Sequence, residues 1–376
     1  MKMRHIVVLL PSIDRIGGAE RQALIAANAL KQRGWRVTLI ALTGSGGEAA
    51  AQLQQNGIGF LSLHMRKGVL DPRGWLQLRR WLRENRPDVL HAHLPHASWM
   101  ARGSRIFSSV PLQLDTVHTP AAGSTLQQWT YRLTSSIPDC VTAVTQSVAN
   151  TYTTSRLIPS DRLFVIPNGI DTNAWAPDAS TRLRIRQQLG IGDEFLWVST
   201  GRFEPVKDHA TLLKAFVSLP AQTHFALIGD GSLAVPVQRA AEKLGIHSRT
   251  HFLGFLEDPR PWLQAADGFV LASRWEGLPM ALLEASSCAL PSVVSDVPGN
   301  NEIISHSLSG ILVPPANPDA LAAGMARLLQ MHPEERAIMG KEARESVVAR
   351  YHLDRVMDQW IALYAGLLGD TPQSHA

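Results

Sequence analysis

The sequence is poor in cysteine and has no long apolar run. Its 376 residues include only two cysteines, Cys140 and Cys288, which excludes a disulfide framework and a cysteine-rich zinc site and favours a reducing compartment. No segment approaches the roughly 18 apolar residues of a transmembrane helix. The basic N-terminus leads into a short apolar run that Pro11 ends, so we expect a first β-strand there and not a signal peptide.

Two ligand-binding motifs are also missing. Residues 12–20, the turn after the first expected strand, contain no Gly-x-Gly-x-x-Gly, which disfavours a nicotinamide-dependent dehydrogenase. The chain has no Asp-x-Asp, the simplest carboxylate pair for a metal–diphosphate complex. The three histidines of residues 91–97 have no carboxylate or cysteine beside them, so they do not indicate a metal site. We therefore expect neither a metal ion nor a cofactor.

Charge is spread unevenly over a chain of otherwise ordinary composition. Apolar residues make up 45% and charged residues 18% of the total, as in soluble globular proteins. Residues 1–170 contain 19 Lys and Arg against 9 Asp and Glu, whereas the remainder contains 17 against 23. The first half therefore favours contact with something anionic. Nucleic acid is not indicated, because no recognition motif accompanies the basic residues.

Short apolar segments alternate with amphipathic ones along the whole chain, which predicts parallel strands connected by helices. The length favours two domains, and the pattern restarts after a stretch rich in Pro, Asn and Asp between Asn168 and Arg184. We therefore expect two doubly wound, Rossmann-like α/β domains in series. Residues 352–369 form a last amphipathic helix, and we expect residues 370–376 to be disordered. The expected strands are residues 5–10, 35–42, 87–93, 112–119, 138–145, 194–202, 223–231, 250–255, 267–273, 291–296 and 309–315.

Two glutamates eight positions apart, Glu276 and Glu284, are the most informative pair. Gly277, Leu278 and Pro279 follow the first, and Pro279 suits the first turn of a helix. A helix that begins near Leu278 or Pro279 would offer free N–H groups to a phosphate at the carboxyl end of a strand. Two carboxylates that can accept hydrogen bonds from hydroxyls, on either side of such a helix end, predict a nucleotide-sugar site. The simpler alternative is two solvated surface glutamates.

Other strand ends carry further candidates. After the strand that ends at Thr200 come Gly201, Arg202 and Lys207, and the two cations suit a diphosphate unless they are ordinary surface residues. Gly229 and Asp230 form another strand-end turn that could face the nucleotide.

The first domain offers two more candidates. Gly17 and Gly18 allow a ligand to approach the backbone closely, or they form a plain turn. His118 ends a strand, where a structural role is the alternative to catalysis. Residues 168–171 favour a turn at the hinge.

The sequence resembles family-4 glycosyltransferases of the GT-B fold, which are retaining enzymes that use nucleotide sugars. The resemblance covers nearly the whole chain in order. Its segments are "GGAE", "HAHLPHA", "TVHTP", "AVTQSVA", "IPNGID", "GRFEPVKDH", "IGDGS", "FLGF" and "EGLPMALLEASSCALPSVVSD".

The resemblance implies a role for each matching residue. Glu276 would hold hydroxyls of the donor sugar and Glu284 those of the ribose, while Arg202 and Lys207 would neutralise the leaving diphosphate. His118 would face the donor sugar and the acceptor. The resemblance assigns catalysis to Glu276, His118, Arg202 and Lys207, and the remaining donor contacts to Gly17, Gly18, Gly201, Gly229, Asp230, Phe255, Gly277, Leu278, Pro279 and Met280.

The fold of that family further implies a central cleft between the domains and a C-terminal helix that crosses back to the first domain. We therefore expect an acceptor-binding domain of residues 1–170 with residues 353–369, and a donor-binding domain of residues 171–352. The sequence departs from the family pattern at Ser286, Ser287, Cys288 and Ala289, where Met-Ala-Cys-Gly is usual, and at Pro298. These departures bear on which donor the protein would prefer and not on its resemblance to this class of enzymes.

The function expected is therefore retaining, metal-independent transfer of a hexose from a nucleotide-diphosphate sugar. We favour a UDP-sugar over a GDP-sugar as donor. The acceptor would be a hydroxyl of a glycan or lipid-linked molecule in bacterial surface polysaccharide or glycoconjugate synthesis. Two alternatives remain, a nucleotide-sugar epimerase of the same fold and a non-catalytic nucleotide-sugar-binding protein.

We expect a cytoplasmic protein, and the basic first half favours a peripheral position on the inner face of the cytoplasmic membrane. Residues 71–87 contain five arginines and two tryptophans. They predict either a core helix with a solvated basic face or a surface that docks on anionic lipid.

Overall fold

The computed structural model describes residues 3–14, 16–66, 71–121 and 123–369 and divides the chain into two compact units. Unit 1 runs to Gly169 and resumes at Asp354, and unit 2 is Ile170–Leu353. These boundaries lie one residue from those expected from the sequence. The tail that we expected to be disordered, residues 370–376, lies outside the described residues.

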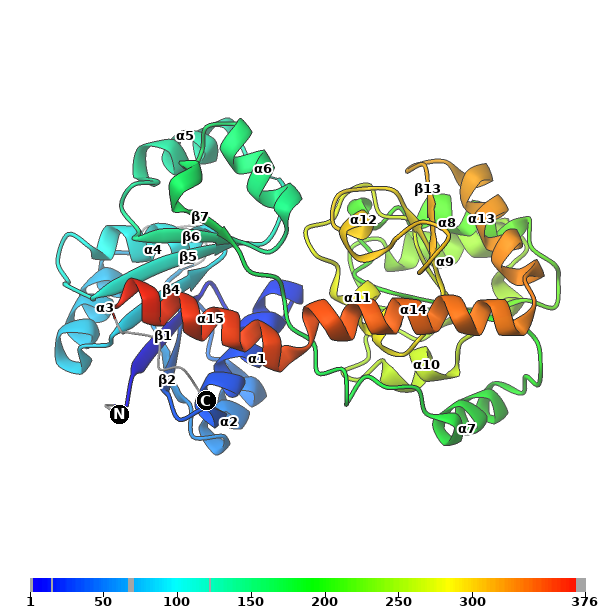
Figure 1. The fold of residues 1–376 in the computed structure, drawn as a ribbon, viewed down its shortest axis with the longest axis horizontal. Helices are drawn as coiled ribbons and strands as arrows, with labels where there is room; N and C mark the ends of the chain where they lie inside the picture. Colours follow the sequence, from blue (N-terminus) through cyan, green and yellow to red (C-terminus); the bar gives the residue numbers. More distant parts are fainter. Residues whose placement is uncertain (1–2, 15, 67–70, 122, 370–376) are drawn as a thin grey trace. The chain divides into compact units, whose positions relative to one another are not determined.

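Unit 1 is built on a parallel sheet of seven strands in the order β3-β2-β1-β4-β5-β6-β7 (Figure 1). Its central strands are buried along their whole length, because both faces of the sheet are covered, and they carry buried His, Gln, Asp and Thr side chains among the apolar ones. The strands are β1 (His5–Leu10), β2 (Arg36–Ala41), β3 (Gly59–Ser62), β4 (Val89–His93), β5 (Leu112–Val117), β6 (Cys140–Ala143) and β7 (Leu163–Val165).

Helices connect these strands and cover the sheet. Leu90 and Ala92 of β4 belong to the core cluster that includes Leu78 and Met100 from two of the helices. The intervening residue, His91, points to the other face, because side chains alternate along a strand. The helices of unit 1 are α1 (Gly18–Gln32), α2 (Gly47–Gln55), α3 (Pro72–Asn85), α4 (Pro95–Ser104), α5 (Thr125–Thr134), α6 (Gln146–Thr154) and α15 (Leu353–Leu367).

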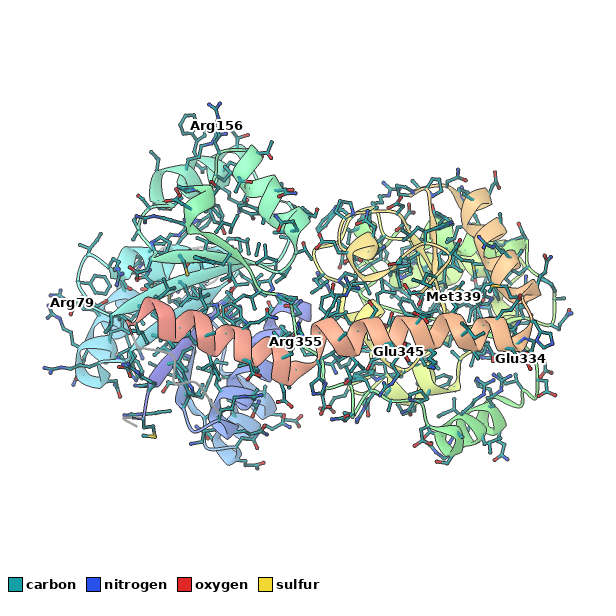
Figure 2. The ribbon with its side chains drawn as sticks, viewed as in Figure 1. Arg79, Arg156, Glu334, Met339, Glu345 and Arg355 are labelled. Carbon is teal, nitrogen blue, oxygen red and sulfur yellow. The ribbon has the colours of Figure 1, made fainter. Side chains whose placement is uncertain are left out.

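Helix α3 turns both of its tryptophans toward the core. The Trp75 ring lies 5.8 Å from Phe107, and the Trp81 ring lies 5.8 Å from His5. Arg79 extends over the Phe107 ring at the outer side of the unit (Figure 2). These contacts agree with the first interpretation of residues 71–87, a core helix with a basic outer face, while docking of α3 on anionic lipid stays a prediction.

Unit 2 contains a second parallel sheet, of six strands in the order β10-β9-β8-β11-β12-β13. Its strands are β8 (Leu196–Thr200), β9 (His224–Ile228), β10 (Thr250–Phe252), β11 (Gly268–Leu271), β12 (Ser292–Ser295) and β13 (Ile311–Val313). Its helices are α7 (Ala179–Leu189), α8 (His209–Val217), α9 (Ala234–Lys243), α10 (Arg260–Ala265), α11 (Met280–Ser287), α12 (Asn300–Ile303), α13 (Pro318–Gln330) and α14 (Pro333–Tyr351).

The two passages of the chain between the units lie side by side. Ile170 donates its N–H to the carbonyl of Tyr351 at 2.8 Å and accepts from the N–H of Leu353 at 2.9 Å. The Thr172 hydroxyl and His352 Nδ1 are 2.7 Å apart. These bonds join the start and the end of unit 2.

Helix α15 belongs to unit 1, as the resemblance implied for the last helix. Arg33 of α1 forms an ion pair with Asp354, and the ring of Trp35 lies 5.6 Å from that of Tyr364. No described helix is both long and apolar enough to span a bilayer.

Candidate active site

The candidate residues of unit 2 gather at the carboxyl ends of four neighbouring strands. The loops after β8, β9 and β10 are bonded together, since Gly201 N–H donates to Ile228 at 2.9 Å and Gly229 N–H to Gly254 at 2.8 Å. A methyl group on Gly229 would lie 1.9 Å from the Gly201 carbonyl oxygen. Only glycine therefore allows these two loops to meet.

Glu276, in the loop after β11, forms an ion pair with Lys207 from the loop after β8. The Lys207 Nζ lies 2.5 Å from Glu276 Oε1, and their side chains are 18% and 11% exposed. The Ser273 hydroxyl donates to the same oxygen at 2.6 Å. The structure therefore brings together two residues that we selected separately, 69 positions apart, and adds Ser273. Ser273 lies three residues before Glu276 in the sequence, and this spacing is the one sequence signal that could have indicated the contact.

A second pair of bonds ties the same two loops. Asp208 begins α8 in the left-handed region (φ 46°) and is almost fully buried. Its carboxylate accepts from Arg274 Nε at 3.0 Å, and the Arg274 N–H donates to the Val206 carbonyl at 2.8 Å. Lys207 therefore lies on a short 3₁₀ turn, residues 205–207, that is anchored on both sides.

Helix α11 begins at Met280 with Pro279 as its N-cap, one to two residues later than expected. Leu278 is buried and Glu284 is 4% exposed, so Glu284 is not a solvated surface glutamate. Behind the loop, Gly299 has φ 89°, and a methyl group there would lie 2.4 Å from the Gly277 carbonyl oxygen. The Pro298 departure thus lies one residue from a glycine that shapes the Glu276–Gly277 backbone.

The other departures from the family pattern lie at the opposite end of α11. Ser286 and Ser287 are fully buried, and the Ser287 hydroxyl donates to the Trp175 carbonyl at 2.7 Å. Arg344 of α14 donates to the Trp175 carbonyl at 3.0 Å and to the Ser287 carbonyl. Ser287 therefore contacts the chain segment that enters unit 2, whereas the Ser286 hydroxyl is enclosed and bonded by no described residue.

Three of the candidates are exposed side chains. Arg202 and Asp230 lie at the surface of the strand-end loops, and Phe255 is 73% exposed. The Asp230 carboxylate accepts from the Gly231 N–H at 2.8 Å. None of the three contacts Glu276 or Lys207 within the described part of the chain, so the structure leaves their assigned roles as expectations.

The candidates of unit 1 lie at the ends of β1 and β5. Gly17 N–H donates to Glu20 Oε2 at 3.1 Å, and a methyl group on Gly17 would lie 2.8 Å from that oxygen. A methyl group on Gly18 would have no neighbour within 4 Å among the described residues. Gly18 therefore borders open space at the N-terminus of α1, where a ligand could approach the backbone.

His118 follows β5 directly, and its Nε2 lies 3.0 Å from Nδ1 of His93. Burial lowers the pKa of His118 to about 4, so the ring is neutral near pH 7. A neutral imidazole can donate from one nitrogen and accept at the other.

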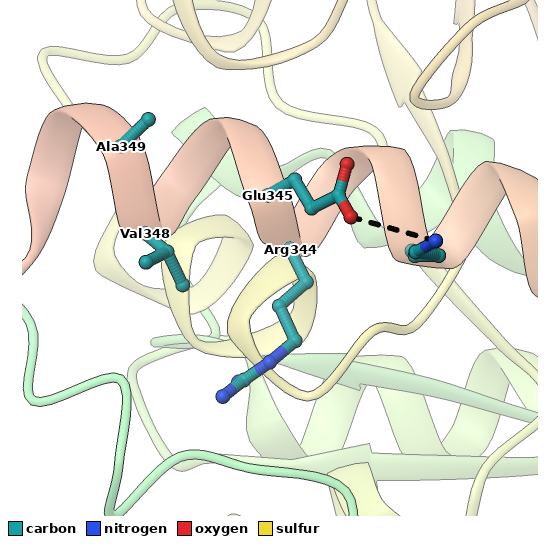
Figure 3. Close-up of a pocket in the computed structure, with 5 residues that line it drawn as sticks. Arg344, Glu345, Val348 and Ala349 are labelled. Carbon is teal, nitrogen blue, oxygen red and sulfur yellow. Dashed lines mark ion pairs between the residues drawn. The ribbon is translucent and has the colours of Figure 1, made fainter.

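The described residues contain no cluster of three or more His, Cys, Asp or Glu arranged for a metal ion. Metal independence stays a prediction. A hollow on the surface of unit 2 is lined by α14 alone, through Lys341, Arg344, Glu345, Val348 and Ala349 (Figure 3). It carries none of the candidate groups.

The arrangement in unit 2 combines a cation, a carboxylate and a helix N-terminus at one sheet edge. A lysine and unpaired N–H groups can stabilise negative charge on a leaving phosphate, since preorganised donors lower the barrier as charge develops. The carboxylate of Glu276 can accept hydrogen bonds from hydroxyls.

Two family models match the chain. Residues 16–174 match glycosyltransferase family 4, and residues 181–346 match glycosyl transferases group 1. The chain is 25% identical to the UDP-Gal:alpha-D-GlcNAc-diphosphoundecaprenol alpha-1,3-galactosyltransferase of Escherichia coli, over 80% of this chain and 81% of that enzyme. It is 26% identical to the lipopolysaccharide core biosynthesis glycosyltransferase LpsE of Rhizobium meliloti, over 97% and 99% of the two chains.

Solved structures show the same fold. HepE of Anabaena in complex with UDP-glucose superposes with a TM-score of 0.86 at 21% identity, covering 96% of this chain and 99% of HepE. Sucrose-phosphate synthase of Thermosynechococcus elongatus gives a TM-score of 0.87 at 20% identity, covering 97% and 100%. The fold is that of GT-B glycosyltransferases, and with both family models matched in order, the chain belongs to the family-4, group 1 glycosyltransferases.

Proposed function

We propose that this glycosyltransferase moves a hexose from a nucleotide-diphosphate sugar to a hydroxyl, with retention of anomeric configuration and without a metal ion. The observation that carries the proposal is the buried contact of Lys207 and Ser273 with Glu276 at the ends of β8 and β11. A cation of the kind that suits a diphosphate thus lies beside a carboxylate of the kind that accepts hydrogen bonds from hydroxyls. A UDP-sugar is favoured as donor, because a relative's name includes UDP-Gal and HepE was crystallised with UDP-glucose.

In this proposal the diphosphate leaves toward Lys207, Arg202 and the N-terminus of α11. Lys207 must then exchange part of its contact with Glu276 for the phosphate oxygens. Glu276 holds sugar hydroxyls, Glu284 holds the ribose, and the leaving phosphate accepts the proton of the acceptor hydroxyl on the same face. Losing one donor that stabilises the leaving charge typically costs about 3–4 kcal/mol of barrier.

The acceptor proposed is a glycan or lipid-linked molecule of bacterial surface polysaccharide or glycoconjugate synthesis. Two relatives point this way by their names, one for a diphosphoundecaprenol acceptor and one for lipopolysaccharide core biosynthesis. A cytoplasmic enzyme that meets such an acceptor would work at the inner membrane face.

Helix α5 is the part of unit 1 that suits contact with a lipid surface. Leu126, Trp129 and Leu133 are 74%, 54% and 74% exposed and lie within an arc of about 60° of the helix, while Tyr131 on another face is buried. Arg132 lies 5.7 Å from the Trp129 ring, and residues 116–138 contain no carboxylate. An exposed apolar stripe with a tryptophan and an arginine, in a basic half of the chain, fits an anionic bilayer.

Flotation with vesicles tests the lipid contact. We expect binding to phosphatidylglycerol vesicles at low salt and none to phosphatidylcholine vesicles. The combined changes Leu126→Ser, Trp129→Ser and Leu133→Ser should abolish binding. Val235→Ser, at an exposed position of α9, is the control. Full binding by the triple variant would refute the role of α5, although donor turnover could still be normal.

Nucleotide release tests the transfer itself. The enzyme is incubated with UDP-, GDP- and dTDP-sugars, with and without glycan or lipid-linked acceptors. Glu276→Gln and Lys207→Ala should each reduce release by 100-fold or more, which corresponds to the loss of about 3 kcal/mol. The matched controls are Glu242→Gln and Lys214→Ala, at exposed positions of the same unit. Near-native turnover in both site variants, or conversion of the donor to an epimer without acceptor, would contradict the proposal.

A further inference from the structure

Two buried histidines in unit 1 lie beside His118 and have none of the roles assigned so far. His91 and His93 lie on β4, 3% and 5% exposed, and their rings are 4.1 Å apart with 31° between the ring planes. His118 follows the adjacent strand β5. From the sequence we considered the first two only as metal ligands and the third only as a single residue.

His91 is fixed by contacts to both of its ring nitrogens. Its Nδ1 lies 2.9 Å from the Tyr364 hydroxyl of α15, and its Nε2 lies 2.6 Å from the Thr116 hydroxyl. The Trp360 ring, also from α15, lies 4.8 Å away. Because both ring nitrogens are bonded, His91 cannot rotate without losing a buried hydrogen bond. The ring of His93 therefore packs against a ring of fixed orientation.

His93 in turn bonds His118. Its Nδ1 lies 3.0 Å from Nε2 of His118, and both rings are neutral near pH 7, because burial lowers the pKa of each. One ring must then donate its N–H and the other must accept. The remaining nitrogen of His118, Nδ1, is enclosed and bonded by no described residue. A buried polar atom without a partner is unfavourable, so a ligand hydroxyl that reached it would restore a lost hydrogen bond.

We propose that His93 is a positioning residue for the transfer reaction, which holds His118 by Nε2 so that only Nδ1 is left for a hydroxyl of the sugar or acceptor. The inference rests on the proposed function and on the expectation from the family resemblance that His118 faces the donor sugar and the acceptor. The hydrogen bond between His93 and His118 also means that the tautomer of one ring determines the tautomer of the other. If His93 donates, His118 carries its proton on Nδ1 and donates to the ligand; if His118 donates, Nδ1 accepts from the ligand hydroxyl.

Two substitutions of His93 by amide side chains distinguish a positioning role of this residue from a role in packing alone. In His93→Asn the side-chain amide falls close to the place of Nδ1, whereas in His93→Gln it falls closer to that of Nε2. Only the asparagine can therefore keep the bond to His118. We expect His93→Gln to reduce kcat about tenfold or more, as for other orienting hydrogen bonds, with little change in the KM for the donor. We expect His93→Asn to retain kcat within about threefold of the native enzyme.

A second readout does not depend on turnover. In protein with ¹⁵N-labelled histidine, the ring-nitrogen shifts of His118 report which nitrogen carries the proton. These shifts should be native-like in His93→Asn and altered in His93→Gln, while the urea midpoints of the two variants stay close together.

Native kcat in His93→Gln, or unchanged His118 shifts in both variants, would overturn the proposal. An equal loss of kcat in both variants that follows an equal loss of stability would also overturn it, because packing alone would then explain the effect. Failure of the proposed function is recognised separately, by native turnover in Glu276→Gln.

Discussion

At the scale of single residues, the lysine and the glutamate of the site in unit 2 form an ion pair with each other. Lys207 and Glu276 neutralise each other at 2.5 Å in a poorly solvated place, where either charge alone would be costly. In the proposed reaction a diphosphate therefore does not meet a free lysine, and its binding must offset the contact that it weakens. Lys207→Ala removes the proposed phosphate partner and also leaves a buried carboxylate without its cation, so its effect on stability must be measured beside its effect on turnover.

Gly18 allows a test of ligand approach that is independent of folding. A methyl group at this position has no neighbour within 4 Å among the described residues. We expect Gly18→Ala to fold with an unchanged or slightly raised melting temperature, since alanine favours helix over glycine by up to about 1 kcal/mol. If a ligand phosphate approaches this backbone, kcat/KM for the donor should fall at least tenfold. Native kcat/KM would show that the ligand does not come near Gly18.

At the scale of elements, α11 and α14 pack closely together. Gly340 of α14 approaches the end of α11 so closely that a methyl group would lie 2.0 Å from the Ala289 carbonyl oxygen. Ala289 itself has φ 56°, a left-handed conformation in which glycine is usual after a helix. Here the family's glycine is replaced, and the close approach is made by the glycine of the other helix.

The pair Gly340→Ala and Gly366→Ala tests this contact. Both residues lie within helices, but a methyl group on Gly366 has no described neighbour within 4 Å. We expect Gly366→Ala to be neutral or stabilising by up to about 1 kcal/mol. Gly340→Ala should destabilise by about 1–3 kcal/mol, because overpacking displaces backbone. Urea unfolding measures both values, and equal effects of the two changes would show that α14 does not need this glycine.

The sequence predicted the elements better than it predicted their contacts. The strands other than β3 and β7, which we did not expect, and the strand-end candidates follow from apolar runs and from glycine and proline at their ends, which are local signals. The bond between Lys207 and Glu276 depends on β8 lying beside β11, and that between His93 and His118 depends on the register of β4 and β5. Nor does periodicity show that Ser287 bonds Trp175, since the two residues are 112 positions apart.

At the scale of the whole molecule, several neutral histidines are enclosed in both units. Burial is the largest cause that lowers the pKa of His91 to about 3 and the pKa values of His118 and His209 to about 4. The usual pKa of histidine is 6.5. Below this pH these histidines bind protons in the unfolded chain but stay neutral in the folded chain. The folded state is therefore destabilised as the pH falls.

The free energy of unfolding should accordingly be nearly independent of these groups above pH 7 and fall between pH 6.5 and 5. Each such histidine contributes a slope of up to about 1.4 kcal/mol per pH unit in this range. Urea midpoints at pH 7.5, 6.5, 5.8 and 5 measure the trend. His209→Asn should make the slope shallower, and a flat profile from pH 6.5 to 5 would contradict the burial of these groups as neutral rings.

The hydrogen bonds between Ile170 and residues 351–353 have a consequence for how the protein can be re-engineered. Both chain ends belong to unit 1, so unit 2 is an insertion within the other unit, and its points of entry and exit are adjacent. Residues 170–353 can therefore be treated as a cassette. Exchanging that cassette for the equivalent part of a relative that uses another nucleotide sugar requires only two junctions, both at one place. If unit 2 selects the donor, the chimera should change its sugar and keep its acceptor.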